Sequence, residues 1–140
     1  PSMQGQAAAM RAALASASLK PEDIDSINAH GTGTQANDAT ETAAIKEVFG
    51  ARATHIPISA TKSVHGHLIG AAGALEFVLS LQALKQGIAL PTMHLDAPDP
   101  DCDLDYVANA ARENAAGRTM LSNSFAFGGT NAVLALGLGR

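Results

Sequence analysis

Apolar residues in the first third of the chain recur with the spacing of a helix and then with that of a short strand. Residues 5–17 are rich in alanine, and Met10 and Leu14 lie one helical turn apart, so we expect a helix there. The segment 25–29 leans toward β structure and predicts a strand. It leads directly into the glycine-rich segment 30–34, so the sequence predicts a strand that ends in a functional loop.

The next stretch repeats this order, with a helix followed by a short strand and a loop. Residues 38–49 carry apolar side chains on one face and predict a helix. Asp38 is followed three residues later by Glu41, which is the spacing of a capping box, so we expect these side chains to close the first turn. Residues 56–60 predict a short strand that leads into the loop 61–67.

Residues 70–86 are apolar on nearly every side. Glu76 is the only charged residue of this stretch before Lys85, so we expect a central helix that is packed all round. A lone carboxylate in such surroundings needs a partner. Because a domain of this size rarely surrounds one helix completely, we expect another part of the protein to cover it.

The remainder of the chain is expected to form a surface loop and a pair of strands. Residues 96–105 contain five aspartates and two prolines and predict the loop. A short strand is expected at 104–108, and longer ones at 119–127 and 131–138, joined by a tight turn at 128–130. Helices thus alternate with strands before a closing strand pair, which predicts an α/β fold with a mixed β-sheet packed between helices.

Composition restricts the classes of protein to which the chain can belong. Its 140 residues are 46% hydrophobic, which predicts one globular domain over 1–140. A net charge of -4 gives no basic footprint, so nucleic acid and anionic membranes are not expected as partners. A single cysteine, Cys102, cannot form a disulfide framework within the chain. Glu76 interrupts the apolar stretch 68–84, so this stretch does not predict a membrane span. No basic, apolar signal region follows Pro1, so we expect no targeting peptide and a cytoplasmic protein.

Polar side chains with catalytic potential are concentrated in loops that follow predicted strands, at 30–34, 62–67 and 123–131. In open α/β sheets, sites form beyond the carboxyl ends of strands, so these loops are expected to converge. His30 and His67, on separate loops, can then donate two hydrogen bonds to one developing oxyanion.

A metal site is an alternative use of the same histidines. His65 and His67 lie two residues apart, a spacing that puts both on one face of a strand and lets them share a metal ion with His30 or His94. No cysteine lies near them in the sequence, and no carboxylates are clustered with them. The ligand set would be incomplete, so we do not expect a metal.

Several motifs taken together are far more specific than any one loop: Asn28 to Thr34, Thr61 to Ser63, Gly66 to Glu76, Cys102 to Tyr106 and Asn123 to Asn131. In order and spacing they resemble the C-terminal half of the β-ketoacyl-acyl carrier protein synthases, condensing enzymes of fatty-acid synthesis with a thiolase-like fold. The resemblance covers essentially the whole chain. It implies that the N-terminal half of such an enzyme, which carries the nucleophilic cysteine, is absent from this chain.

The resemblance implies a reaction and assigns residues to it. In this family an acyl group sits on the cysteine while malonyl-carrier protein loses carbon dioxide, and the resulting enolate attacks the acyl thioester. His30 and His67 match the active-site histidines, which would hydrogen-bond the malonyl thioester oxygen. Lys62 matches the family lysine that sets the electrostatics of the site, and Glu76 would be its buried partner. Phe127 matches the gating phenylalanine, whose backbone N–H resembles half of an oxyanion hole.

The same resemblance implies what the site binds. Thr32 and Thr34 match threonines that contact the phosphopantetheine arm, and Phe125 and Gly128 would also contact the substrate. No cofactor is implied, because the substrates are carried on the phosphopantetheine arm of acyl carrier protein. The implied partners are acyl carrier protein, the N-terminal half of the same enzyme and a second copy in a homodimer, and the chain by itself is expected to be inactive.

Departures from the family pattern leave the product open. Gly33 and Gln35 look more like polyketide or nodulation-type synthases than the commonest fatty-acid type. A thiolase would carry a reactive cysteine in the loop 127–129, where this sequence has none, and Cys102 does not match the family nucleophile. A noncatalytic chain-length subunit is a further alternative, against which the intact histidines and lysine speak. We therefore expect an elongating 3-oxoacyl-[acyl-carrier-protein] synthase, an acyltransferase.

Overall fold

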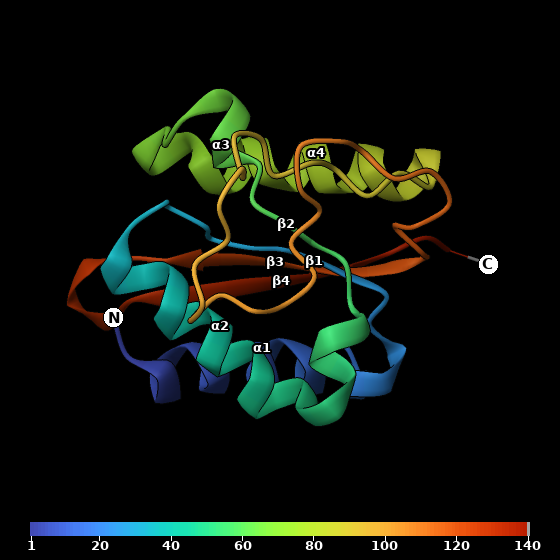
Figure 1. Cartoon of the computed structure of the whole chain (residues 1–140). Coiled ribbons are helices and arrows are strands. Elements are labelled where there is room, and N and C mark those ends of the chain that lie inside the picture. The colour runs from blue at the N-terminus through green and yellow to red at the C-terminus, as the bar shows by residue number, and fades with distance from the viewer. Residues whose placement is uncertain (140) are drawn as a thin grey trace.

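A four-stranded sheet lies between layers of helices (Figure 1). The computed structural model describes residues 1–139. Its strands are β1 (Ser26–Asn28), β2 (Ile58–Ser59), β3 (Thr119–Phe125) and β4 (Asn131–Gly137). Its α-helices are α1 (Met3–Ser16), α2 (Gln35–Phe49), α3 (Lys62–His65) and α4 (Ala72–Gln86), and the short 3-10 helices are η1 (Pro21–Asp23), η2 (Gly50–His55), η3 (Ile69–Ala71) and η4 (Phe127–Gly129).

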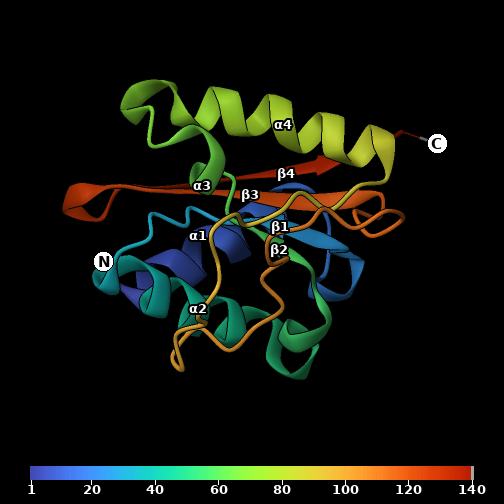
Figure 2. The same ribbon diagram turned by 45° about the horizontal axis from the view of Figure 1, so that its top comes forward.

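The sheet is mixed, as the sequence predicts. Its strands run in the order β2-β1-β3-β4; β1 pairs in parallel with both β2 and β3, and β4 returns antiparallel to β3. Figures 1 and 2 show α1 and α2 on one face of the sheet and α4 on the other. Since β1 is covered on both faces, even its polar residues are buried, and Ser26 and Asn28 hydrogen-bond to Ala116 O and Ser80 Oγ.

The larger hydrophobic core lies between the sheet and the helix pair α1 and α2. Met10 of α1, Ile45 of α2, Ile27 of β1 and Leu121 of β3 are each fully buried there. A smaller core lies under α4, where Leu84 packs with residues of β3 and β4. The central strands are therefore held from both faces, which gives the loops at their ends a rigid base.

The helix α2 begins earlier than the expected capping box allows. It starts at Gln35, and the Thr34 side chain caps it by accepting a hydrogen bond from the Asn37 N–H at 3.3 Å. Asp38 lies inside the first turn, where the partial positive charge of the helix N-terminus stabilises its carboxylate. The prediction of a capping box formed by Asp38 and Glu41 is wrong, because Thr34 already supplies the cap.

The apolar helix α4 is covered on one side only within the described residues. Glu76 and Ser80 are fully buried, whereas Phe77 is 41% and Val78 51% exposed. The prediction of a helix packed all round is therefore wrong for this chain, because nothing between residues 1 and 139 covers the outer face of α4. We call Phe77, Val78 and the exposed Ile69 the outer apolar face.

Long loops connect α4 to the strand pair. Residues 96–105 form neither helix nor strand, as predicted. The strand expected at 104–108 is reduced to isolated bridges. Tyr106 pairs with Ile58 of β2, which is only two residues long, and Ala108 pairs with Thr92. In the part of the chain that the structure describes, no helix is long and apolar enough to cross a bilayer.

Candidate active site

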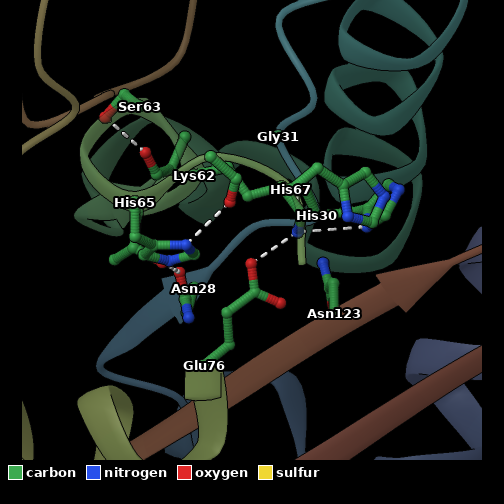
Figure 3. A network of polar contacts seen from close by, with 12 residues as sticks. Asn28, His30, Gly31, Lys62, Ser63, His65, His67, Glu76 and Asn123 are labelled. Atoms are coloured by element: carbon green, nitrogen blue, oxygen red, sulfur yellow. Dashed lines mark hydrogen bonds and ion pairs between the residues drawn. The ribbon is translucent and has the colours of Figure 1, made fainter. Parts of the chain in front are cut away.

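The loops that follow the parallel strands meet at one edge of the sheet. Because β1, β2 and β3 are parallel, their carboxyl ends lie together. His30 follows β1, Lys62 opens α3 just after β2, and His67 comes from the turn after α3. Figure 3 shows these side chains gathered in one space with Glu76, which reaches in from α4. The predicted convergence of the loops that carry the histidines and the lysine is confirmed.

The rings of His30 and His67 lie edge to face. Their centroids are 5.5 Å apart, and their planes are inclined at 84°. Phe125, at the end of β3, packs against His30 with ring centroids 5.9 Å apart. His30 is 8% exposed, whereas His67 is open to solvent. The two imidazoles are thus close enough to reach one small acceptor between them.

Lys62 is buried and its ammonium group is fully partnered. It pairs with Glu76, and the two side chains are only 4% and 1% exposed. Nζ also donates to the His30 carbonyl oxygen at 2.6 Å and lies 3.4 Å from His30 Nδ1. A buried charge is tolerated only with such partners. The lone carboxylate of α4 therefore has the partner that its burial requires.

The hydrogen bonds at the Nδ1 atoms define the tautomers of both histidines. An ammonium group can only donate, so His30 Nδ1 is an acceptor toward Lys62. His67 Nδ1 accepts a hydrogen bond from the Ile69 N–H at 3.1 Å. In a neutral imidazole the other nitrogen then carries the proton. Both rings are therefore donors at Nε2.

The protonation of His30 gives a prediction for the intact protein. Burial, followed by the charge of Lys62 and the proximity of His67, lowers the pKa of His30 from 6.5 to about 4. Below pH 6.5 the unfolded chain binds a proton at His30, whereas the folded protein binds it only below about pH 4. The contribution of His30 to the free energy of unfolding is therefore fully present above pH 6.5 and is lost as the pH falls from 6.5 to about 4. We expect NMR titration of the ring to show this low midpoint; a midpoint at or above the ordinary value contradicts it.

A hollow beside His67 is bordered by one of the expected substrate contacts. It has a volume of about 320 Å³, and its lining includes Thr32, Lys62 and His67. The hydroxyl oxygens of Thr32 and Thr34 are 2.9 Å apart. Because Thr34 also caps α2, its hydroxyl has a structural role, while Thr32 is one of the residues that line the hollow.

Comparison with known proteins identifies the family. Residues 1–96 match the family profile described as beta-ketoacyl synthase, C-terminal domain. The chain belongs to this family. It is 55% identical over 135 residues to nodulation protein E of Rhizobium meliloti and 49% identical over 136 residues to 3-oxoacyl-[acyl-carrier-protein] synthase 2 of Coxiella burnetii. These alignments cover 96% and 97% of this chain but 33% of each relative, so the chain spans about a third of their length.

A solved structure agrees with this β-ketoacyl synthase fold. The chain superposes with a TM-score of 0.93 on AntDE:AntF, a type II PKS acyl-carrier protein in complex with its ketosynthase. The identity is 36%, and the match covers 99% of this chain and 34% of that one. The mixed sheet between helices is therefore the C-terminal part of a thiolase-like fold, as the resemblance implied.

The loop after β3 in this β-ketoacyl synthase domain only partly joins the histidine pair. Phe125 packs against His30, but Phe127 is 102% exposed, so its ring touches neither histidine. Gly128 and Gly129 follow with φ angles of 76° and 81°, a backbone that favours glycine. The structure thus places Phe125 against His30, whereas the ring of Phe127 extends into solvent.

Other reactive side chains of the β-ketoacyl synthase domain lie apart from the pair. His65 uses Nδ1 with Gly66 O and Nε2 with Thr61 Oγ1, at 2.7 and 3.2 Å. Burial and neighbouring aspartates raise the pKa of the Cys102 thiol, which disfavours the nucleophilic thiolate. Between residues 1 and 139, no three His, Cys, Asp or Glu side chains gather where they could hold a metal ion.

Glu41 contacts the site, although its spacing in the sequence predicts only a helix cap. The carboxyl is 2% exposed, and it accepts hydrogen bonds from the backbone N–H groups of His30 at 2.9 Å and Gly31 at 3.0 Å. Burial raises the pKa of Glu41, and its hydrogen bonds oppose the rise. A signal was present, because Glu41 lies one turn before Ile45 on the apolar face of its helix.

Proposed function

We propose that the protein to which this chain belongs is a 3-oxoacyl-[acyl-carrier-protein] synthase of the elongating type. The observation that carries the proposal is the histidine pair, held 5.5 Å apart with both rings protonated at Nε2, in a domain of the β-ketoacyl synthase family. Preorganised donors stabilise negative charge that develops on one oxygen. Decarboxylation of a malonyl thioester creates such a charge.

The proposed reaction begins with an acyl group held as a thioester on a cysteine outside this chain. His30 and His67 then bind the thioester carbonyl oxygen of malonyl-acyl carrier protein. The bond to the malonyl carboxylate breaks, carbon dioxide leaves, and the electron pair forms an enolate whose oxygen the two N–H groups stabilise. The enolate carbon attacks the acyl carbonyl, and the cysteine sulfur leaves as thiolate.

Lys62 contributes to this reaction through His30. Its ammonium group faces His30 Nδ1, so it keeps the ring neutral and directs the Nε2 proton toward the substrate. Glu76 balances the buried charge of the lysine. His30 therefore donates a hydrogen bond to the enolate without giving up its proton.

The substrate contacts are proposed at the rim and wall of the site. Thr32 and Thr34 contact the phosphopantetheine arm, and Phe125 and Gly128 also contact the substrate. The ring of Phe127 is the gate, and its backbone N–H forms half of an oxyanion hole. The exposure of this ring and the glycines that follow it support a movable side chain.

The proposed partners follow from the surface and from the relatives. Acyl carrier protein delivers the substrates, as AntF is in complex with its ketosynthase in the matched structure. The N-terminal half of the same enzyme covers the outer apolar face, because a patch of this kind is rarely left exposed. The enzyme is proposed to act as a cytoplasmic homodimer without a cofactor, in fatty-acid synthesis or a related polyketide or nodulation-type pathway.

The test of this function is an assay of the enzyme translated from the complete reading frame. We expect the acyl-loaded enzyme to release carbon dioxide from malonyl-acyl carrier protein and to form 3-oxoacyl-acyl carrier protein in equal amounts. An enzyme that accepts the acyl group but releases no carbon dioxide contradicts the proposal. A noncatalytic chain-length subunit would do neither.

A further inference from the structure

We propose that His65 is a positioning residue that holds His67 in place for decarboxylation, an inference that rests on the function proposed above. Its Nδ1 lies 2.7 Å from the Gly66 carbonyl oxygen, and its Nε2 lies 3.2 Å from Thr61 Oγ1. Because a carbonyl oxygen only accepts, Nδ1 carries a proton and donates it to this hydrogen bond. His65 therefore acts on the backbone that leads into His67.

The helix α3, which separates Lys62 from His67, is too short to be rigid by itself. It has four residues, and a single helical turn fixes several backbone angles for very few hydrogen bonds. Its N-cap residue, Thr61, makes no side-chain cap hydrogen bond. The His65 ring reaches back to Thr61 at the start of the helix and forward to Gly66 at its end, so one side chain ties the two ends together.

Gly66 is the residue at which the chain can change direction before His67. Its φ angle of 74° is a left-handed conformation that favours glycine. A Cβ atom at this position would meet nothing within 4 Å, so no packing restrains the turn from that side. The Gly66 carbonyl belongs to the peptide that joins Gly66 to His67. The hydrogen bond from His65 therefore sets the plane of that peptide and the direction in which His67 leaves it.

His67 has few other contacts that could hold it. It lies between α3 and η3 in a segment without helix or strand, and it is open to solvent. Its Nδ1 accepts the Ile69 N–H, but Ile69 is 78% exposed and has a φ angle of 52°, which is costly for a β-branched residue. That contact stays within the loop, whereas the contact from His65 ties the loop to the helix before it.

Thr61 extends this connection to the strand that precedes His30. Its hydroxyl oxygen is hydrogen-bonded to the side-chain amide of Asn28 at 3.3 Å, and both residues are buried. Asn28 is the last residue of β1, and His30 follows two residues later. His65 and Asn28, which Thr61 joins, lie together in Figure 3. The series His65, Thr61 and Asn28 thus links the His67 turn to the His30 loop.

His65 has no place in the hollow beside the catalytic pair. Gly66 and His67 line this hollow, whereas His65 is not among its lining residues over 1–139. Loss of the two hydrogen bonds of the His65 ring should therefore move His67 without removing a contact to the substrate. The side chain is half-buried, so the fold tolerates its replacement better than that of a core residue.

The experiment compares His65→Phe with His55→Phe in the intact enzyme, the second being the same substitution at an exposed histidine of η2. We expect His65→Phe to lower kcat for malonyl decarboxylation by about tenfold, because small misplacements of a catalytic group have effects of this size. KM and the rate of acyl loading should stay within about twofold. His55→Phe should change none of these quantities. An unchanged kcat overturns the inference, as does an equal fall in decarboxylation and loading.

A crystal structure of His65→Phe supplies a second readout that does not depend on activity. We expect the Gly66 carbonyl to turn and the separation of the His30 and His67 ring centroids to depart from 5.5 Å. A folded variant with an unmoved His67 ring overturns the inference. If the unaltered enzyme releases no carbon dioxide, the proposed function fails, and the ring position alone decides the role of His65.

His65→Gln decides the question if His65→Phe does not fold. The two contacts of His65 start from nitrogens on different sides of a rigid ring, and a glutamine amide has one donor nitrogen, so it cannot reproduce both. A fall in kcat of about threefold or more with a displaced His67 ring supports the inference. An unmoved ring with unchanged kcat overturns it. If both variants fold, His65→Gln should retain more activity than His65→Phe.

Discussion

Replacing Lys62 with alanine is expected to destabilise the intact enzyme by about 3–5 kcal/mol, the range measured when one partner of a buried ion pair is removed. The substitution leaves the Glu76 side chain 1% exposed without its ammonium partner. The His30 carbonyl oxygen also loses its donor. Denaturant unfolding of the intact enzyme measures the change in the free energy of unfolding.

Two comparisons separate this effect from a general loss of charge. Lys46→Ala removes an ion pair with Asp103 on the surface, where the side chains are 43% and 56% exposed, and should cost no more than about 1 kcal/mol. The double substitution Lys62→Met with Glu76→Leu replaces the buried pair by apolar side chains and should recover most of the stability. A Lys62→Ala enzyme as stable as the unaltered one contradicts the assignment of a buried, mutually dependent pair.

Local periodicity was sufficient to predict most of the secondary structure. The helix expected at 5–17 and the strands expected at 119–127 and 131–138 agree with α1, β3 and β4 to within two residues at each end. These segments carry strong repeating patterns, and their neighbours in space do not change them. The meeting of His30 with Lys62 followed from a rule of topology, because parallel strands place their carboxyl ends together.

The errors arose where the structure depends on contacts with distant residues. Glu41 has the spacing of a capping residue, but its role comes from N–H groups of the His30 loop and from Asn123, which lies 82 positions away. Phe77 and Val78 on the outer side of α4 are exposed within residues 1–139, although the sequence pattern predicts a helix that is buried all round. A periodic pattern shows that a helix is apolar all round, but it does not show which part of the protein covers each side.

Replacing His67 with alanine is expected to lower malonyl decarboxylation by the intact enzyme by about two to four orders of magnitude, as when an oxyanion donor or acid-base group is removed. The structure gives the reason. The Ile69 N–H holds His67 Nδ1 at 3.1 Å, so the ring presents Nε2–H beside His30. Alanine leaves the enolate oxygen with one donor, whereas His67→Asn keeps an amide donor and should lose less activity.

The half reactions distinguish this role from damage to the site. Loading of the acyl group onto the cysteine does not create the malonyl enolate, so it should suffer less than decarboxylation in His67→Ala. His55→Ala, an exposed histidine on η2, is the matched control and should change neither rate. Release of labelled carbon dioxide and acyl transfer are measured separately. Normal decarboxylation with complete loss of loading would reverse the assignment, since His67 would then act on the cysteine and not on the enolate.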